Sequence, residues 1–201
     1  MRYVKPDSFE AASTLLLEEQ GTSRILAGGT DVLVQLKSEV VEPDLMVDLK
    51  HLPGMRDILA EDGGFRIGAA VAGAVLGEHD GVKSQWPGVV EGMELIGSTQ
   101  VQGRATMVGN LCNGSPAGDA VPAMITAGAT ARLHGPDGVR DVPVQDIPVG
   151  PGKTSIAKGE FVTSIYLPAR PERASDAYLR FIPRTEMDIA VSSAAVNLEL
   201  D

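Results

Sequence analysis

Two short runs of small residues, far apart in the chain, constrain its fold and its ligand more than any other feature. The first is AGGTD at residues 27–31, and the second is TMVGNLCNGSPAGD at residues 106–119. Each run places glycines, free backbone N–H groups and short polar side chains where a strand is expected to turn. Backbone N–H groups gathered in such a turn form a concave anion site, which glycines let a ligand approach closely. Two such sites predict a ligand with a central diphosphate, as in a dinucleotide cofactor.

Either run alone is more often an ordinary connection than a phosphate site, because the chain contains 23 glycines. The pair carries more weight, since a short carboxylate, Asp31 or Asp119, follows the small residues in each run. The sequence contains neither G-x-G-x-x-G nor G-x-x-x-x-G-K-[ST], so the Rossmann and P-loop fingerprints are absent. We therefore expect a different binding geometry.

The composition is ordinary for a globular chain and excludes several classes of protein. With 201 residues, 43% of them hydrophobic and 22% charged, the chain can form one domain or two small lobes. The formal net charge is −10, and no basic stripe with interleaved aromatic residues occurs, which argues against nucleic-acid binding. The sequence shows no apolar signal-peptide segment and no run of about 20 apolar residues, so we expect no membrane span and a cytoplasmic location.

Few side chains are placed to carry chemistry of their own. Cys112 is the single cysteine, so the chain can form no internal disulfide and cannot supply the roughly four thiolates of an iron–sulfur cluster. The histidines, His51, His79 and His134, are scattered, and each is interpreted as a lone surface side chain. We expect no metal site and no catalytic acid or base, which suits a protein whose chemistry belongs to a bound cofactor.

The first 55 residues predict a small α/β lobe. Asp7 or Ser8 can cap the first helix, and Thr30 or Asp31 can cap the second, whose N-terminus would point at the first glycine run. The expected elements are strands over 2–4, 24–26 and 45–48, a helix from residue 9 that ends before Gly21, and a helix over 32–37.

Residues 56–201 predict a second lobe, of α+β type with an antiparallel or mixed sheet. The turns EDGG at 61–64 and GPDG at 135–138 each separate two apolar runs, which is typical of hairpins. The segment 97–104 is expected to be a connection into the second glycine run. The expected strands are 57–60, 65–69, 130–134, 139–142, 161–167, 177–181 and 190–200, and the expected helices are 72–77, 89–96 and 121–127.

Four ordered motifs resemble the FAD-binding medium subunit of the molybdenum hydroxylases, a family that includes the xanthine dehydrogenase and carbon monoxide dehydrogenase flavoproteins. The AGGTD run matches the family's first FAD loop. The similarity covers nearly the whole chain, so it is far more specific than one glycine run. The other motifs are IGSTQVQGRAT at 96–106 with GNLCN at 109–113, Ser115-Pro116 and Asp119; GEF at 159–161 with Leu167-Pro168; and Arg184 with DIA at 188–190.

The resemblance implies a two-lobed fold of the molybdopterin dehydrogenase (PCMH-like) type, with FAD extended between the lobes. Residues 25–32 would wrap the diphosphate and ribityl region, residues 106–110 would complete the cradle, and Asp119 would hydrogen-bond the cofactor. Cys112 would lie beside the flavin as a small apolar filler. The residues expected to bind FAD are Ile25, Leu26, Ala27, Gly28, Gly29, Thr30, Asp31, Val32, Ile96, Thr106, Met107, Val108, Gly109, Asn110, Cys112, Ser115, Asp119, Val162 and Arg180.

No lysine or arginine lies in residues 27–36. A diphosphate bound there would be neutralised by backbone N–H groups and helix N-termini, each interaction contributing on the order of 1 kcal/mol. An acidic chain can therefore hold an anionic cofactor without a basic pocket.

The sequence departs from the family pattern at two points. The family usually has two consecutive glycines before the asparagine, and the first of them is Val108 here. A positive φ at that position would cost a valine about 1–3 kcal/mol. The resemblance also implies a further C-terminal lobe of about 80–100 residues, whereas the sequence given stops at Asp201.

The first hypothesis for function is an electron-transfer flavoprotein subunit of a molybdenum-containing hydroxylase. FAD would receive electrons from a small [2Fe-2S] partner subunit and pass them to NAD, quinone or oxygen, while a large molybdopterin-binding subunit hydroxylates the substrate. A second hypothesis is a flavin- or nucleotide-binding module without turnover. A third is a stand-alone FAD-dependent reductase of the same broad fold, for which the sequence identifies no substrate acid or proton donor.

Overall fold

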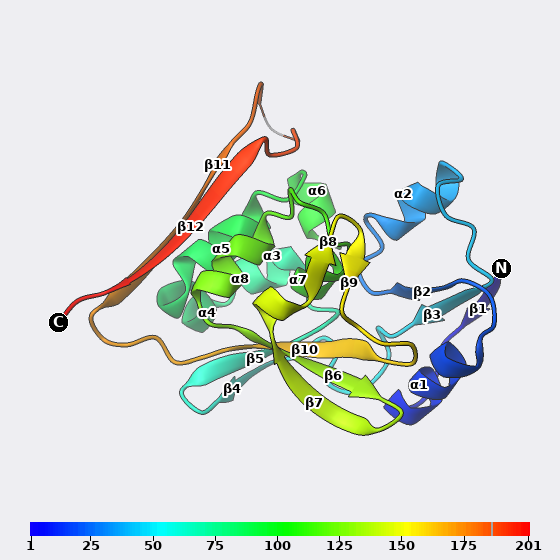
Figure 1. Ribbon diagram of the computed structural model, residues 1–201. Coiled ribbons are helices and arrows are strands. Elements are labelled where there is room, and N and C mark those ends of the chain that lie inside the picture. Colours follow the sequence, from blue (N-terminus) through cyan, green and yellow to red (C-terminus); the bar gives the residue numbers. More distant parts are fainter. Residues whose placement is uncertain (186) are drawn as a thin grey trace.

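A computed structural model describes residues 1–185 and 187–201 (Figure 1). Its N-terminal part is a parallel three-stranded sheet in the order β1-β3-β2. All four residues of the central strand β3 are buried, as expected for a parallel strand covered on both faces. The elements of this part are β1 (Arg2–Val4), α1 (Phe9–Glu18), β2 (Ser23–Leu26), α2 (Val32–Lys37) and β3 (Leu45–Asp48).

The larger sheet is antiparallel and has the strand order β4-β5-β10-β6-β7. The first of its hairpins turns at Asp62 and Gly63, which both have positive φ, as a tight two-residue hairpin turn requires. The α+β architecture with an antiparallel sheet is therefore confirmed, while the lobe boundary at residue 55 stays a prediction. The strands are β4 (Ile58–Glu61), β5 (Gly64–Gly68), β6 (Thr130–Gly135), β7 (Gly138–Pro143) and β10 (Phe161–Leu167).

A layer of short helices covers one face of the larger sheet, and a long two-stranded ribbon, β11–β12, runs along the outside of that layer (Figure 1). The ribbon packs on α5 and α8. The helices are α3 (Gly73–Gly77), α4 (Asp80–Gln85), α5 (Pro87–Glu94), α6 (Thr99–Gln102), α7 (Met107–Cys112) and α8 (Ala120–Thr126). The remaining elements are the 3-10 helix η1 (Val144–Asp146) and strands β8 (Pro148–Gly150), β9 (Lys153–Thr154), β11 (Ala174–Phe181) and β12 (Ser192–Glu199).

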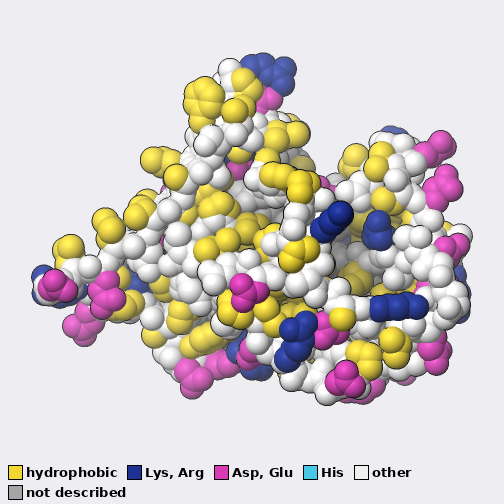
Figure 2. All heavy atoms as spheres, in the orientation of Figure 1, with side chains coloured by type: hydrophobic (Ala, Val, Ile, Leu, Met, Phe, Trp, Pro, Cys, Tyr) yellow, Lys and Arg dark blue, Asp and Glu magenta, His cyan; other side chains and the backbone are white. Residues whose placement is uncertain are grey.

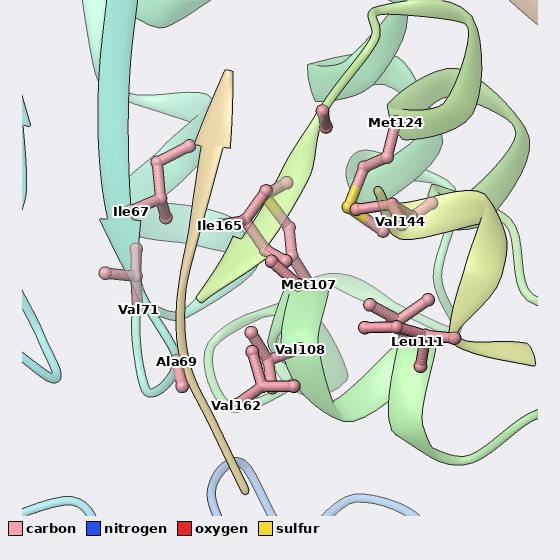
Figure 3. Close-up of a cluster of buried hydrophobic side chains, with 14 of the residues drawn as sticks. Ile67, Ala69, Val71, Met107, Val108, Leu111, Met124, Val144, Val162 and Ile165 are labelled. Atoms are coloured by element: carbon pink, nitrogen blue, oxygen red, sulfur yellow. The ribbon is translucent and has the colours of Figure 1, made fainter. Parts of the chain in front are cut away.

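One continuous hydrophobic core joins the two sheets and the helical layer. It extends from Ala12 and Leu16 of α1 to Tyr178 of the ribbon. Figure 3 shows Met107 of α7 beside Ile165 of β10 and Val108 beside Val162 of the same strand, with Leu111 one turn further along α7. This packing fixes the position of the second glycine run relative to the larger sheet.

The structure corrects the expected conformation of the second glycine run. Residues 107–112 are helical rather than a turn after a strand, because Thr106 caps α7 by accepting a hydrogen bond from Gly109 N at 2.9 Å. The apolar residues Met107 and Leu111, four apart, then face the core. Val108 is not one of the residues with positive φ, and its side chain is buried in this helix. The helix therefore accommodates valine at this position without backbone strain.

Three smaller expectations were wrong. The segment 97–104 was expected to be a connection, but it contains the helix α6, which begins after the capping residue Ser98. The helix α4 was not expected. His134 is buried rather than at the surface, because it stacks between Phe9 and Phe161 with ring centroids 5.6 and 5.8 Å away. Short helices and tertiary stacking leave weak periodicity in a sequence, which explains these misses.

Candidate functional site

A cavity of about 590 Å³ lies where the two sheets meet. Its walls come from β2, α2, the start of α7, the β9 region and the start of β10, and Figure 2 shows this face hollowed between α2 and the β8–β9 hairpin. The volume is typical of a cofactor site. Twelve of the residues predicted to bind the cofactor line it: Ile25, Ala27, Gly28, Gly29, Thr30, Asp31, Val32, Thr106, Val108, Gly109, Cys112 and Val162.

The first glycine run follows β2 and passes directly against the backbone near α7. A Cβ atom on Gly28 would lie 2.1 Å from the carbonyl oxygen of Arg104, so no side chain fits there. Gly29 has a φ of +85°, which glycine adopts without strain. The first run therefore contacts the segment that leads into the second, and a hydrogen bond of 3.2 Å from Asn113 Nδ2 to Asp31 Oδ1 joins the two runs themselves.

Unpaired backbone donors lie in this first run. Among the described residues, the N–H groups of residues 28–31 donate to no protein acceptor, whereas Leu33 N already donates to Gly29 O at 3.1 Å. Successive unpaired N–H groups beside a cavity fit an anionic group. The donors and the close backbone approach therefore fit the diphosphate of a dinucleotide.

Charged side chains at the cavity balance one another. Arg24 and Lys158 are positive, and Asp31 and Glu160 are negative. Arg140 donates two hydrogen bonds of 2.7 Å to Glu160 and holds the pKa of that carboxyl below its usual value. Burial raises the pKa of Asp31. The lining therefore provides no excess of positive side chains, and the backbone is left as the main source of anion binding.

Cys112 lines the same cavity and is partly buried. Burial raises the pKa of its thiol to about 12. The thiol is therefore neutral near pH 7, where it offers an apolar contact rather than a thiolate.

Five of the residues predicted to bind the cofactor do not line the cavity, but pack or form hydrogen bonds in the segments around it. Leu26 and Met107 are buried in the core, and Ile96 is packed against it. The amide oxygen of Asn110 accepts a hydrogen bond from the first backbone N–H of α8 at 3.1 Å. The hydroxyl of Ser115 accepts one from a backbone N–H two residues later at 3.2 Å. Their contact with a cofactor stays a prediction.

The last two predicted residues, Asp119 and Arg180, bind each other. Arg180 donates from Nη1 to Asp119 Oδ2 at 2.9 Å, and the Tyr178 hydroxyl donates to Asp119 Oδ1 at 2.7 Å. Burial raises the pKa of Tyr178 to about 12. Both carboxylate oxygens of Asp119 thus bind the β11–β12 ribbon, and contact of Asp119 and Arg180 with a cofactor stays a prediction.

Sequence reasoning missed the wall opposite the glycine runs. The GPGKT segment at 150–154 was not predicted to belong to the site, but Gly152 N donates to Gly114 O at 2.9 Å and brings this segment to the cavity. Among the residues that were missed, Asn113 could have been found from its position in the GNLCN motif at residues 109–113. The missed lining residues are Leu16, Ser23, Arg24, Gln35, Val40, Val41, Asn113, Gly152, Thr154, Ile156, Ala157, Lys158, Gly159, Glu160 and Phe161.

The part of the chain that the structure describes contains neither a metal-ligand cluster nor a membrane-spanning helix. Across residues 1–185 and 187–201, no three His, Cys, Asp or Glu side chains come together in a way that could hold a metal ion. No helix in the same residues has the length and apolar character needed to cross a membrane.

Comparison with known proteins gives a consistent result over most of the chain. Residues 1–170 match the family described as the FAD binding domain in molybdopterin dehydrogenase. The xanthine dehydrogenase FAD-binding subunit of Escherichia coli O157:H7 is 34% identical, over 96% of this chain and 69% of the relative. The carbon monoxide dehydrogenase medium chain of Afipia carboxidovorans is 32% identical, over 98% of this chain and 68% of the relative.

Solved structures agree with these relatives. A crystal structure of the Cu,Mo-containing CO dehydrogenase in its cyanide-inactivated form superposes with a TM-score of 0.92 at 31% identity, over all of this chain and 70% of the other. Quinoline 2-oxidoreductase from Pseudomonas putida 86 gives a TM-score of 0.90 at 25% identity, over all of this chain and 69% of the other. The predicted two-lobed fold is thereby confirmed. The chain belongs to the family of FAD-binding domains found in molybdopterin dehydrogenases.

Proposed function

We propose that this chain is the FAD-binding electron-transfer subunit of a molybdenum-containing hydroxylase. The observation that carries the proposal is the cavity between the two glycine runs, where the N–H groups of residues 28–31 have no protein acceptor. Bound there, FAD would supply the reversible electron transfer, and the protein would supply binding and orientation. Family membership supports the same assignment.

The chain's own residues bind and orient the cofactor in this proposal. The backbone of residues 28–31 holds the diphosphate from one side, and the start of α7, fixed by the Thr106 cap, holds it from the other. Val108 and Val162 supply apolar contacts at the same cavity and exclude water there. The neutral thiol of Cys112 belongs to this apolar surface.

Partner subunits supply the remaining steps of the proposed reaction. By its family membership, the chain receives electrons from a small [2Fe-2S] subunit, and its single cysteine, which cannot build an iron–sulfur cluster, fits that division. A large molybdopterin-binding subunit carries out the hydroxylation, and NAD, quinone or oxygen accepts the electrons. The complex is assigned to the cytoplasm. Co-purification of this chain with a large and a small subunit tests the partner assignment, and a flavin-loaded chain with no partner in its native host would contradict it.

Equilibrium titration with FAD, followed by flavin fluorescence, tests the cofactor site. Gly28→Ala is expected to weaken FAD binding at least roughly tenfold, because its Cβ would lie 2.1 Å from Arg104 O and must push the two runs apart. Gly103→Ala is the matched control, since the nearest neighbour of its Cβ would be Gln100 O at 3.4 Å, an ordinary van der Waals contact. Equal affinities of the two variants, or no FAD uptake by the folded wild-type chain, would contradict the assignment.

A further inference from the structure

The helix α2 forms part of the cavity wall, although it is hardly packed into the protein. Val32 and Gln35 of α2 line the cavity, as do Val40 and Val41 just beyond it. None of its six residues is buried, and Figure 1 shows it standing apart from the helical layer. A segment with so few buried contacts opens at low free-energy cost.

One side chain, Asn113, connects α2 to the main body of the protein. Its Nδ2 donates to Asp31 Oδ1 at 3.2 Å, and its Oδ1 accepts from Gln35 Nε2 at 3.2 Å. The Asp31 carboxylate only accepts, which fixes the orientation of the Asn113 amide. Among the described residues, the segment 27–42 makes no other side-chain hydrogen bond to the rest of the protein.

The two sides of this connection differ in rigidity. Asn113 is the C-cap of α7, a helix anchored in the core by Met107 and Leu111. Asp31 and Gln35 belong to the exposed end of the first glycine run and to α2. All three side chains line the cavity. Asn113, at the end of a helix anchored in the core, thus holds the loosely packed helix α2 through two hydrogen bonds.

We propose that Asn113 is a positioning residue that holds α2 closed beside the bound cofactor. The cofactor enters and leaves when Asp31 and Gln35 detach from Asn113 and α2 swings away. One oxygen of Asp31 is engaged by Asn113, so the same contact orients the carboxylate at the cavity. This inference rests on the proposed function for the nature of the ligand, whereas the tethering of α2 can be measured without any ligand.

The first test uses the chain without FAD and measures tryptic cleavage after Lys37, an exposed residue at the end of α2. Asn113→Ala is expected to accelerate this cleavage roughly tenfold, because both tethering hydrogen bonds are lost. Asn113→Asp alone is expected to do the same, since it opposes two carboxylates. The double variant Asn113→Asp with Asp31→Asn exchanges the donor and the acceptor of the hydrogen bond between residues 113 and 31. It is expected to restore the protection of Lys37 against cleavage.

The control is Asn197→Ala on the β11–β12 ribbon, which removes a hydrogen bond from Asn197 Nδ2 to Thr126 O of α8. It is expected to leave cleavage after Lys37 unchanged. Two results would contradict the tethering of α2 by Asn113. One is an unchanged cleavage rate in Asn113→Ala. The other is a double variant, Asn113→Asp with Asp31→Asn, that is cleaved as fast as Asn113→Asp alone.

The second test measures the rate of FAD release from the loaded chain by the recovery of flavin fluorescence. Asn113→Ala is expected to release FAD roughly tenfold faster than the wild type, while Asn197→Ala releases it at the wild-type rate. Faster cleavage without faster release would overturn the cofactor role of Asn113. No FAD uptake by the wild type would overturn the proposed function and that role together, and the cleavage rates would still decide the tether.

Discussion

Asp119 shows how a single buried charge organises its surroundings. Its two oxygens accept from Tyr178 and Arg180, and the side chains of Asp119 and Arg180 are 10% and 8% exposed. Because so little water reaches the carboxylate, a lost donor leaves one oxygen unsatisfied. This contact fastens the β11–β12 ribbon to the start of α8.

Tyr178→Phe is expected to lower the free energy of unfolding by about 1–2 kcal/mol, because it removes a hydrogen bond to a buried carboxylate. Urea denaturation followed by circular dichroism measures the difference. Tyr166→Phe is the control, since no hydrogen bond of the Tyr166 hydroxyl is found among the described residues. Equal losses for the two variants would show that the Asp119 contact contributes nothing to stability.

Glu61 illustrates a residue whose contribution depends on pH. Arg66 donates two hydrogen bonds of 2.6 Å to it, which holds the pKa of the Glu61 carboxyl below its usual range. A depressed folded-state pKa gives stability that is present above the unfolded pKa and is lost as the pH falls through the folded one.

Glu61→Gln is therefore expected to destabilise the chain by about 0.5 kcal/mol at pH 7, a small value because the pair is partly exposed. The difference should disappear once the pH falls below the lowered pKa of the wild-type residue. Denaturant midpoints measured from pH 7 down to about pH 3 check this, with the pH range set by the ordinary glutamate pKa. A difference that does not shrink between pH 7 and the acid end would contradict the ion pair as its cause.

At the level of elements, the start of α7 forms the second half of the proposed cofactor site. Thr106→Ala is expected to lower the stability of the chain without FAD by about 1 kcal/mol, since the Gly109 N–H loses its capping acceptor. Thr106→Ser keeps the hydroxyl and should lose much less, which thermal unfolding of both variants would reveal. Equal destabilisation by Ala and Ser would mean that the threonine methyl group, not the cap, matters.

The elements also show which features could be predicted from sequence. The strands over 45–48 and 161–167 and the helix over 32–37 were predicted with their observed bounds, because turn residues flank clear apolar runs. The helix α7 was missed because its glycine suggested a turn, although the Thr106 cap and the spacing of Met107 and Leu111 were readable.

The site could be predicted in its glycine runs but not in its far wall. The motif gave residues 27–31, all of which line the cavity. Val162 was predicted from the family resemblance, but the segment 152–161 reaches the cavity through the hairpin β8–β9 and the hydrogen bond from Gly152 to Gly114, a pairing that no local sequence pattern indicates. Long-range contacts of this kind depend on tertiary packing, which overrides local propensity.

At the scale of the whole molecule, the cavity lies where a parallel sheet and an antiparallel sheet share one core. Lining residues come from both sheets and from α2 and α7, so a bound cofactor contacts segments that are distant in the sequence. A ligand held at such a junction stabilises the arrangement of the entire chain, because it binds only the folded state.

The most direct measurement of the central claim is a crystal structure of this chain with FAD. We expect the diphosphate to contact the backbone N–H groups of residues 28–31 and the start of α7 at residues 108–109. We also expect α2 to close beside the cofactor with Asn113 bonded to Asp31. FAD bound away from the two glycine runs, or a folded chain that crystallises without FAD at saturating concentration, would contradict this expectation.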